Sequence, residues 1–294
     1  MERNISITME NIKNHPLYKR YSLDNIISTI LEFYKSRFII LFLFSLVVSV
    51  ITVFYTNAFI DLNALQEITD PEELLLVFND MVFPLLIIGL ISLLFYMVLN
   101  LYIIQSPLNE SHNLWQSIKQ SVHLVVPFLI TMILFFFATS LAAVVGLSLL
   151  IIGIFFTMLY MFSIYLLLLP VFIVEGNNIG SAIVRSIRIT HNGFWSNIGW
   201  IAIVVLVYMV ASLVLSSIIT IPFAGNILKT LFDPDAAAAT VAYTSKPIYL
   251  VLSAAASALL TPIFPIFGTM LYFNGRAKED ISSKKEEEQN YPKD

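Results

Sequence analysis

Four ionisable side chains stand at the ends of long apolar runs and could form a charge network. Glu175 directly follows one such run, Arg185 and Arg188 come ten and thirteen residues later, and Arg276 follows the last run. A carboxylate beside guanidinium groups forms charge-assisted hydrogen bonds, which are roughly twice as strong as neutral ones. We therefore expect these four residues to join helix ends at one membrane interface. The alternative for Glu175 is a solvated loop acid without such partners.

Two polar residues inside the apolar runs are candidates for a polar site within the membrane. Asn100 is the one strongly polar residue in the core of its run, and Thr261 lies beside Pro262 and Pro265. Broken helices with polar groups near the bilayer centre are typical of solute transporters. The other explanation for Asn100 is an interhelical hydrogen bond, which contributes about 0.6 kcal/mol.

The sequence has no arrangement typical of an enzyme or a metal site. It contains no cysteine, its four histidines are not paired at i,i+4 spacing, and it has neither a Gly-rich phosphate loop nor a G-x-S-x-G motif. The cores of the apolar runs also lack Asp, Glu, Lys and Arg, which mark most ion pathways in membranes. We expect a non-enzymatic protein with no catalytic residues, no cofactor, no metal and no nucleic-acid partner.

Six apolar helices, each long enough to cross a membrane, would position these residues. Apolar residues make up 58% of the chain and charged residues only 12%, against about 25% in soluble domains. Residues 124–174 carry no charge, and a charge at the bilayer centre costs about 2.5–3.5 kcal/mol. This run holds two spans with a turn between Gly146 and Gly153, because one span takes about 20 residues. The expected spans are residues 38–56, 81–105, 124–145, 150–174, 195–222 and 247–273.

The expected fold class is therefore an all-α integral membrane protein with a single membrane domain. Residues 21–275 form this domain and residues 1–20 form a flexible N-terminus. Residues 276–294 form a charged, flexible tail with too few apolar side chains to fold. A proline inside a span kinks its helix, which neighbouring helices make tolerable. We expect kinks at Pro127, Pro170, Pro262 and Pro265.

The distribution of Lys and Arg predicts the orientation. Successive connections between spans lie on opposite sides of the membrane. Of the 16 Lys and Arg residues, 14 then fall on one side, and only Lys229 and Lys246 fall on the other. Basic segments next to membrane spans stay in the cytoplasm. Both termini are thus expected to be cytoplasmic.

Three amphipathic stretches precede the first, third and fifth spans and divide the chain into three repeated units. They lie at residues 23–35, 112–122 and 179–192. Each has apolar side chains on one helical face and polar side chains on the other, which is typical of a helix lying in the membrane interface. Each unit is thus an interfacial amphipathic helix followed by a helical hairpin. Such helices either seat the bundle at headgroup level or form a collar that binds lipid or a partner.

Two of the connections on the other side contain signals for a helix start. Asp70-Pro71-Glu72-Glu73 places Asp at the N-cap and Pro at the first helical position, which predicts a short external helix leading into the second span. Asp233-Pro234-Asp235 is a weaker version of the same signal.

Several segments together carry a family resemblance. They are SLDNIISTILEFYKSRFIILFLF at residues 22–44, LPVFIVEG at residues 169–176, SAIVRS at residues 181–186, GFW at residues 193–195 and TMLYFNGR at residues 269–276. These segments resemble a widespread prokaryotic family of six-span membrane proteins. The family includes the membrane domain fused to some glycerophosphodiester phosphodiesterases and related uncharacterised inner-membrane proteins.

The resemblance implies a six-span fold and localisation in the bacterial cytoplasmic (inner) membrane. It implies no phosphodiesterase activity, because the sequence holds no such catalytic domain. Two positions depart from the family pattern. Ile152-Gly153-Ile154 stands where the family usually has Pro-Gly-Ile, and Asn274 stands where an Asp is usual, so an acid-dependent role does not carry over to this position.

Two functions follow from these observations. The first is a non-enzymatic membrane protein that organises membrane lipids or a membrane-protein partner. The alternative is a transporter or channel for a small or amphipathic solute. A polar cavity lined by Asn100 and Thr261 would favour transport, and a dry centre filled with Leu and Phe would favour the first function.

Overall fold

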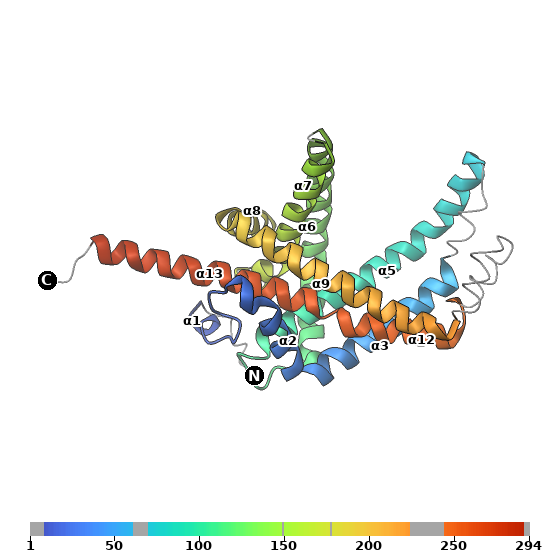
Figure 1. The fold of residues 1–294 in the computed structure, drawn as a ribbon, viewed down its shortest axis with the longest axis horizontal. Coiled ribbons are helices and arrows are strands. Elements are labelled where there is room, and N and C mark those ends of the chain that lie inside the picture. Colours follow the sequence, from blue (N-terminus) through green and yellow to red (C-terminus); the bar gives the residue numbers. More distant parts are fainter. Residues whose placement is uncertain (1–8, 61–69, 149, 177, 224–243, 291–294) are drawn as a thin grey trace. The chain divides into compact units, whose positions relative to one another are not determined.

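The computed structural model describes residues 9–60, 70–148, 150–176, 178–223 and 244–290, and every regular element in these ranges is helical. The main helices are α1 (Met9–Ile12), α2 (Ile26–Ser36), α3 (Phe38–Phe59), α5 (Pro71–Gln105), α6 (Leu114–Ser148), α7 (Leu150–Val174), α8 (Ile179–Asn192), α9 (Phe194–Thr220), α12 (Pro247–Leu260) and α13 (Ile263–Asn290). Short 3-10 turns, η1 (Leu23–Asn25) and η2 (Ile221–Phe223), precede α2 and follow α9 (Figure 1).

Six helical segments of the described chain are long and apolar enough to cross a membrane. They are Phe38–Phe59, Leu75–Gln105, Leu114–Ser148, Ile152–Val174, Phe194–Thr220 and Pro247–Ser283. The predicted all-α fold with six membrane-spanning helices is thus confirmed, and the chain is a multi-pass membrane protein.

The chain divides into two compact units. Unit 1 comprises residues 1–36, 96–205 and 263–294, and unit 2 comprises residues 37–95 and 206–262. Helices α5 and α9 each contribute residues to both units.

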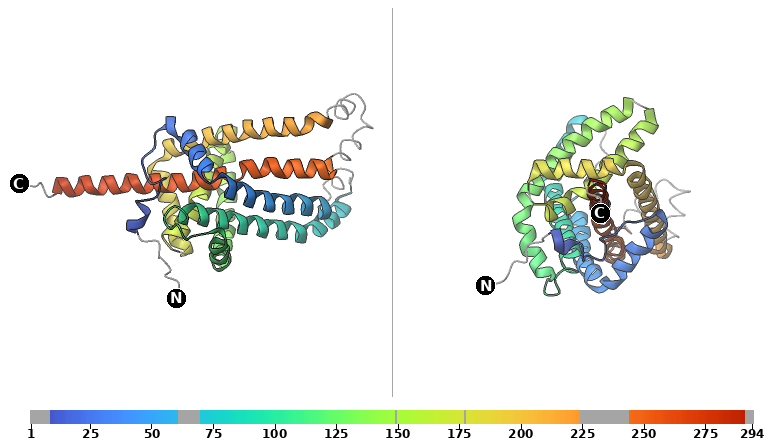
Figure 2. Two further views of the ribbon diagram at one scale, coloured as in Figure 1. Left: turned by 90° about the horizontal axis from the view of Figure 1, so that it is seen from below. Right: turned by 90° about the vertical axis from the view of Figure 1, so that its left-hand side faces the viewer.

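In unit 2, α3 packs along α12 (Figure 2). The buried residues of α3 are Leu41, Ser45 and Ser49, and those of α12 are Leu250, Ala254 and Ala258. Both sets repeat at i,i+4 and so form one stripe along each helix. Small side chains in such stripes let membrane helices approach closely, because dispersion contacts rather than a hydrophobic driving force hold them together.

In unit 1, α6 and α7 form a helical hairpin and α13 packs against α7 (Figure 1). Consecutive α7 side chains from Leu166 to Leu169 are fully buried, as are Phe267 and Phe273 of α13. At the tip of the hairpin, a Cβ on Gly146 would lie 3.0 Å from Cα of Ile154 on α7. The turn between α6 and α7 falls where the two glycines predicted it.

The N-terminal segment differs from the predicted flexible residues 1–20. Ile12 and Leu17 are only 1% exposed and pack against other parts of unit 1. His15 is buried, its Nε2 lies 3.0 Å from the carbonyl oxygen of Ile103, and its ring lies 4.6 Å from that of Phe273. These apolar side chains are too few to give a periodic pattern, so composition alone could not predict this packing.

The C-terminal segment also differs from the predicted flexible residues 276–294. Helix α13 continues from the membrane to Asn290. Ala277 is buried, and Asp280 pairs with Lys13 at 3.2 Å. Tertiary contacts therefore hold the first turns beyond the membrane, and the Lys and Glu residues that follow are good helix formers.

Two of the three predicted interfacial stretches are separate helices, α2 and α8, and the third is not. Residues from Leu114 onward belong to the continuous helix α6 that also spans the membrane. Nothing in this stretch breaks the helix, whereas Gly193 separates α8 from α9 and Arg37 separates α2 from α3.

The predicted helix start before the second span is present. The amide N–H of Glu72 donates to Oδ1 of Asp70 at 3.0 Å, and α5 runs without a break into the span. The expected start at residues 233–235 lies outside the described residues.

Among the six spans in the described part of the chain, proline interrupts only one. Thr261 and Pro262 separate α12 from α13, whereas Pro127 and Pro170 lie within the continuous helices α6 and α7. Pro84, inside α5, carries no such break either.

His112, just before α6, gives the fold a dependence on pH. It is buried, and its Nε2 lies 2.8 Å from Oγ of Ser117. Burial lowers the pKa of His112 below its ordinary value of 6.5. The unfolded chain then binds a proton more readily than the folded chain. The contribution of His112 to the free energy of unfolding is therefore fully present above about pH 6.5 and is lost as the pH drops below that value.

We therefore expect the Tm in detergent to fall more between pH 8 and pH 5 in the wild-type protein than in His112→Gln. Glutamine can still hydrogen-bond to Ser117 but does not titrate. The other three histidines are common to both proteins, so the difference between the two slopes isolates His112. Equal slopes would contradict this role.

Candidate functional site

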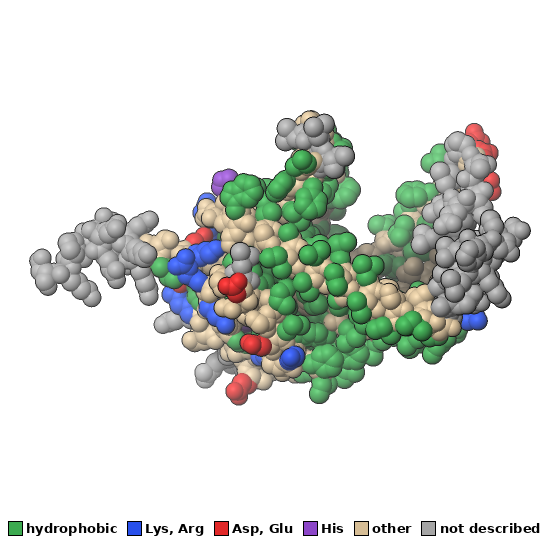
Figure 3. Space-filling model, viewed as in Figure 1, with side chains coloured by type: hydrophobic (Ala, Val, Ile, Leu, Met, Phe, Trp, Pro, Cys, Tyr) green, Lys and Arg blue, Asp and Glu red, His purple; other side chains and the backbone are tan. Residues whose placement is uncertain are grey.

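Ionisable side chains from three elements of unit 1 form a cluster that we call the charged cluster. Its members are Glu175, Arg185, Tyr272, Arg276 and Glu279. Figure 3 shows Lys, Arg, Asp and Glu side chains gathered near α8 and the part of α13 beyond its apolar half, while hydrophobic side chains cover much of the other helices.

Local structure at the end of α7 brings Glu175 and Arg185 together. Glu175 directly follows α7, and Gly176 adopts a φ of 106°, which favours glycine and lets the chain reverse. Asn178 then caps α8, with its side chain accepting a hydrogen bond from the Ser181 amide. Two turns into α8, Arg185 faces back towards Glu175.

Arg185 bridges two carboxylates. Its Nε donates to both carboxylate oxygens of Glu175, at 3.1 and 3.0 Å, and its other nitrogens donate to the two oxygens of Glu279. Its side chain is only 14% exposed. Burial by itself lowers the pKa of Arg185, but the hydrogen bonds with Glu279 and Glu175 outweigh it and raise the pKa above its usual value. Arg185 therefore stays charged and links α7, α8 and α13.

Two α13 residues complete the cluster. The NH1 nitrogen of Arg276 lies 3.6 Å from Glu175 and 3.7 Å from Glu279, and the Tyr272 hydroxyl donates to Oε1 of Glu175 at 2.9 Å. Two carboxylates thus meet two guanidinium groups, and the charges balance within the cluster. Such an arrangement holds helix ends together rather than leaving a free acid or base.

The structure brings together three of the four residues that the sequence singled out. Arg188 is exposed on α8 and belongs to none of the ion pairs of the charged cluster. The sequence interpretation missed Tyr272 and Glu279. Both stand on one face of α13 with Arg276, at i−4 and i+3, but this spacing carries meaning only once the helix is known to continue past the membrane.

A second ionic contact ties the N-terminal segment to α13. Asp280 accepts a hydrogen bond from the Tyr18 hydroxyl at 2.7 Å and pairs with Lys13 at 3.2 Å. Burial and the hydrogen bond to Asp280 raise the pKa of Tyr18, so its hydroxyl remains a donor.

The two candidate polar residues of the spans lie in different units and bond within their own helices. Asn100 is buried in unit 1 and its Nδ2 donates to the Tyr96 carbonyl at 2.9 Å, while its Oδ1 has no partner among the described residues. Thr261 belongs to unit 2 and its hydroxyl donates to the Ser257 carbonyl. Within the described ranges, no three His, Asp or Glu side chains are grouped to hold a metal ion.

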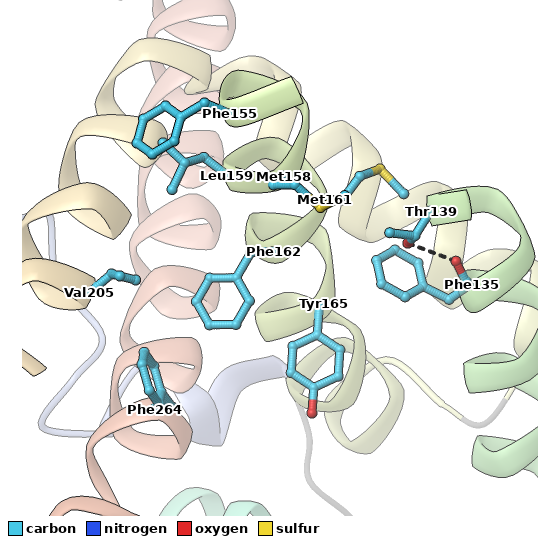
Figure 4. Close-up of a pocket in the computed structure, with 10 residues that line it drawn as sticks. All are labelled: Phe135, Thr139, Phe155, Met158, Leu159, Met161, Phe162, Tyr165, Val205 and Phe264. Atoms are coloured by element: carbon cyan, nitrogen blue, oxygen red, sulfur yellow. Dashed lines mark hydrogen bonds between the residues drawn. The ribbon is translucent and has the colours of Figure 1, made fainter. Parts of the chain in front are cut away.

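An apolar pocket of ≈ 470 Å³ lies among four helices of unit 1 (Figure 4). Phe135 and Thr139 come from α6, five aromatic or Met side chains and Leu159 from α7, Val205 from α9, and Phe264 from α13. The Thr139 hydroxyl donates to the Phe135 carbonyl at 2.9 Å and so is satisfied within its own helix. The pocket therefore offers an apolar ligand a wall of aromatic and thioether side chains.

A second apolar pocket, of ≈ 580 Å³, adjoins the first. The two share Phe135, Thr139 and Tyr165, which form the wall between them. The remaining lining of the second pocket comes entirely from α6.

The chain matches no protein-family model, no curated protein and no solved structure. The suggested family therefore stays a prediction from the sequence segments, and the function is argued from this geometry.

Proposed function

We propose that this chain is a non-enzymatic protein of the bacterial cytoplasmic membrane that binds membrane lipid and organises lipid or a membrane-protein partner. The observation that carries the proposal is the pair of adjoining apolar pockets on α6 and α7. A diacyl lipid has two hydrocarbon chains, and two apolar pockets separated by a shared wall match that chemistry. In the bilayer core such pockets have hydrocarbon, not water, as their solvent.

The surface of the spans supports lipid contact. In the most apolar stretch of α6, only 11% of the residues are buried inside the protein, whereas in that of α7 39% are buried. Large apolar side chains such as Phe136, Leu141 and Val144 are exposed along α6. A soluble protein rarely exposes apolar patches of more than a few hundred Å², so α6 is suited to lipid or to another membrane helix.

The charged cluster supports an inner-interface position for the ends of α7 and α8. It lies where α13 leaves its apolar half, and the predicted orientation puts this end of unit 1 in the cytoplasm. With both termini cytoplasmic, the cluster would hold the helix ends at headgroup level, and α2 and α8 would lie in the interface.

One observation favours the alternative of solute transport. The sixth span is interrupted at Thr261 and Pro262, and discontinuous helices form substrate sites in many transporters. Against this, neither Asn100 nor Thr261 lines the pockets described above. Unit 1 buries many Leu and Phe side chains, and buried hydroxyls such as those of Ser163 and Thr190 lie within hydrogen-bond distance of each other rather than lining these pockets. Solute flux in liposomes is the test of this second function.

A pocket-filling substitution tests the lipid proposal. Leu159→Trp puts an indole into the first pocket, and Leu141→Trp makes the same change on α6, where the side chain is 71% exposed and lines neither pocket. The indole removes dispersion contacts of the lipid chain, each worth about 0.1–0.2 kcal/mol, so the loss of about ten of them weakens lipid binding by roughly tenfold.

The readout is the lipid that stays bound after purification in mild detergent, quantified by mass spectrometry of the extract. We expect Leu159→Trp to retain several-fold less lipid than Leu141→Trp, with equal Tm values showing that both fold. Equal retention by the two variants and the wild-type protein would overturn the assignment of the pocket.

A further inference from the structure

A polar cavity of ≈ 610 Å³ lies at the end of unit 1 that carries the charged cluster. The N-terminal segment contributes Arg20, the end of α8 contributes Asn192, and α13 contributes Asn274 and Lys278. Polar groups dominate its lining, in contrast to the two apolar pockets. This cavity is not used by the function proposed above.

The cavity carries a positive charge that the described side chains do not neutralise. Arg20 and Lys278 both line it, and their charges are close enough to repel one another. Glu279 also lines it, but this carboxylate is already held by Arg185 and Arg276. Among the described residues, neither Arg20 nor Lys278 forms an ion pair.

The lysine is held in place and an amide donor stands beside it. The Nζ of Lys278 lies 5.1 Å from the centre of the Trp200 ring, which is only 2% exposed. Asn274 is buried, and its Oδ1 accepts a hydrogen bond from the Tyr21 amide at 3.1 Å. Its amide NH₂ is therefore left as a hydrogen-bond donor on a residue that lines the cavity.

We propose that this cavity binds a phosphate group, with Arg20 and Lys278 neutralising its charge and Asn274 donating a hydrogen bond. Guanidinium and ammonium groups with a nearby amide donor are what a phosphoryl oxygen requires. On α13 the cavity lining begins at Asn274, directly after the expected sixth span at residues 247–273, so the predicted orientation puts it near the lipid headgroups. The phosphate could belong to an anionic lipid or to a soluble phosphate, and the same side chains would serve both.

Asn274→Asp introduces a negative charge with little change in shape. An Asp at this position keeps an oxygen for the Tyr21 amide, but it replaces the donor with a negative charge. If the cavity binds phosphate, Asn274→Asp weakens binding while the fold is kept. The double variant Arg20→Gln, Lys278→Gln removes both cations. Lys119→Gln is the matched control, because Lys119 also lies over a tryptophan ring, that of Trp115, at 5.7 Å but outside the cavity.

Binding is measured on the full chain with two probes. Calorimetry in detergent uses inorganic phosphate, and native mass spectrometry uses nanodiscs that contain phosphatidylglycerol or phosphatidylcholine. The double variant removes both cationic donors, so it should bind at least about tenfold more weakly. Lys119→Gln should bind like the wild-type protein, and unchanged Tm values show that the variants fold.

The outcomes separate the two sources of phosphate. Selective retention of phosphatidylglycerol, lost in Asn274→Asp and in the double variant, assigns a lipid headgroup. Calorimetric binding of inorganic phosphate without lipid selectivity, lost in the same variants, assigns a soluble ligand. Absence of both kinds of binding in the wild-type protein, or equal binding by all variants, overturns the proposal. None of these results depends on lipid in the apolar pockets, which Leu159→Trp tests separately.

Discussion

Gly268→Ala should lower the free energy of unfolding by about 3 kcal/mol, because overpacking against a rigid backbone has no cheap relief. A Cβ on Gly268 would lie 2.6 Å from the carbonyl oxygen of Leu166 on α7. The obstacle is backbone in the middle of a span, not the end of a flexible side chain. Either α13 must move away from α7 or α7 must bend.

Pro170 explains why this carbonyl is available to a neighbouring helix. Proline has no N–H, so residue 170 cannot donate the usual helical hydrogen bond to the Leu166 carbonyl four residues earlier. Gly268 brings its own backbone against that oxygen, where a Cα–H can partly satisfy it. Pro170 of α7 and Gly268 of α13 thus act together in the close packing of these two helices.

Gly199→Ala is the control for this prediction. Nothing lies within 4 Å of a Cβ built on Gly199, which is also inside a helix of the bundle. Alanine there should leave stability unchanged or raise it slightly, since Ala is the better helix former. Thermal unfolding in mild detergent, followed by circular dichroism, compares the two variants. Similar Tm values for both would show that α7 and α13 are not in close contact at Gly268.

Glu175→Gln should lower the free energy of unfolding by about 2 kcal/mol, because it leaves two guanidinium groups with one carboxylate between them. Removing one partner of a fully buried pair costs more, but Glu175 and Arg185 are 19% and 14% exposed, so water offsets part of the loss. Glutamine can still accept the hydrogen bond from Tyr272, so the change isolates the charge.

Arg188→Gln is the matched control for the charged cluster. It removes one charge from the same helix at an exposed position outside the cluster. The Tm of Glu175→Gln in detergent should fall by several degrees, and that of Arg188→Gln should stay within error of the wild-type value. An unchanged Tm for Glu175→Gln would contradict the role of the cluster in holding α7, α8 and α13 together.

The spans could be predicted from the sequence because they depend on composition alone. A run without charges must lie in lipid, and its length gives the number of crossings. Asp70 before Pro71 likewise predicted the start of α5, because a cap is formed by neighbouring residues. Both signals are local, and tertiary packing does not change them.

The sequence could not predict features that depend on tertiary neighbours. The polar residues after Arg276 indicate an unfolded tail when the sequence is taken alone. In the structure, Glu279 pairs with Arg185 and Asp280 accepts a hydrogen bond from Tyr18. Ile12 and Leu17 belong to no periodic pattern in the sequence, yet both are buried within unit 1. The contact between Gly268 and Leu166 joins residues about a hundred positions apart, and no pattern in either helix indicates it.

The charged cluster shows the same division within one site. Glu175, Arg185 and Arg276 could be grouped because each stands at the end of a span. Their exact partners could not be predicted. Arg185 and Arg188 follow Glu175 by ten and thirteen residues, so both were candidates, yet Arg188 is exposed. Which of two arginines on α8 meets the acid depends on how the helix is rotated against α7 and α13.

Native mass spectrometry of the wild-type protein, released from nanodiscs made with bacterial lipid, tests the central claim most directly. Lipid binding predicts discrete mass adducts that match one class of diacyl lipid and persist at collision energies that remove the detergent. A bare protein under the same conditions would contradict it, and liposome flux assays would then become the relevant test of function.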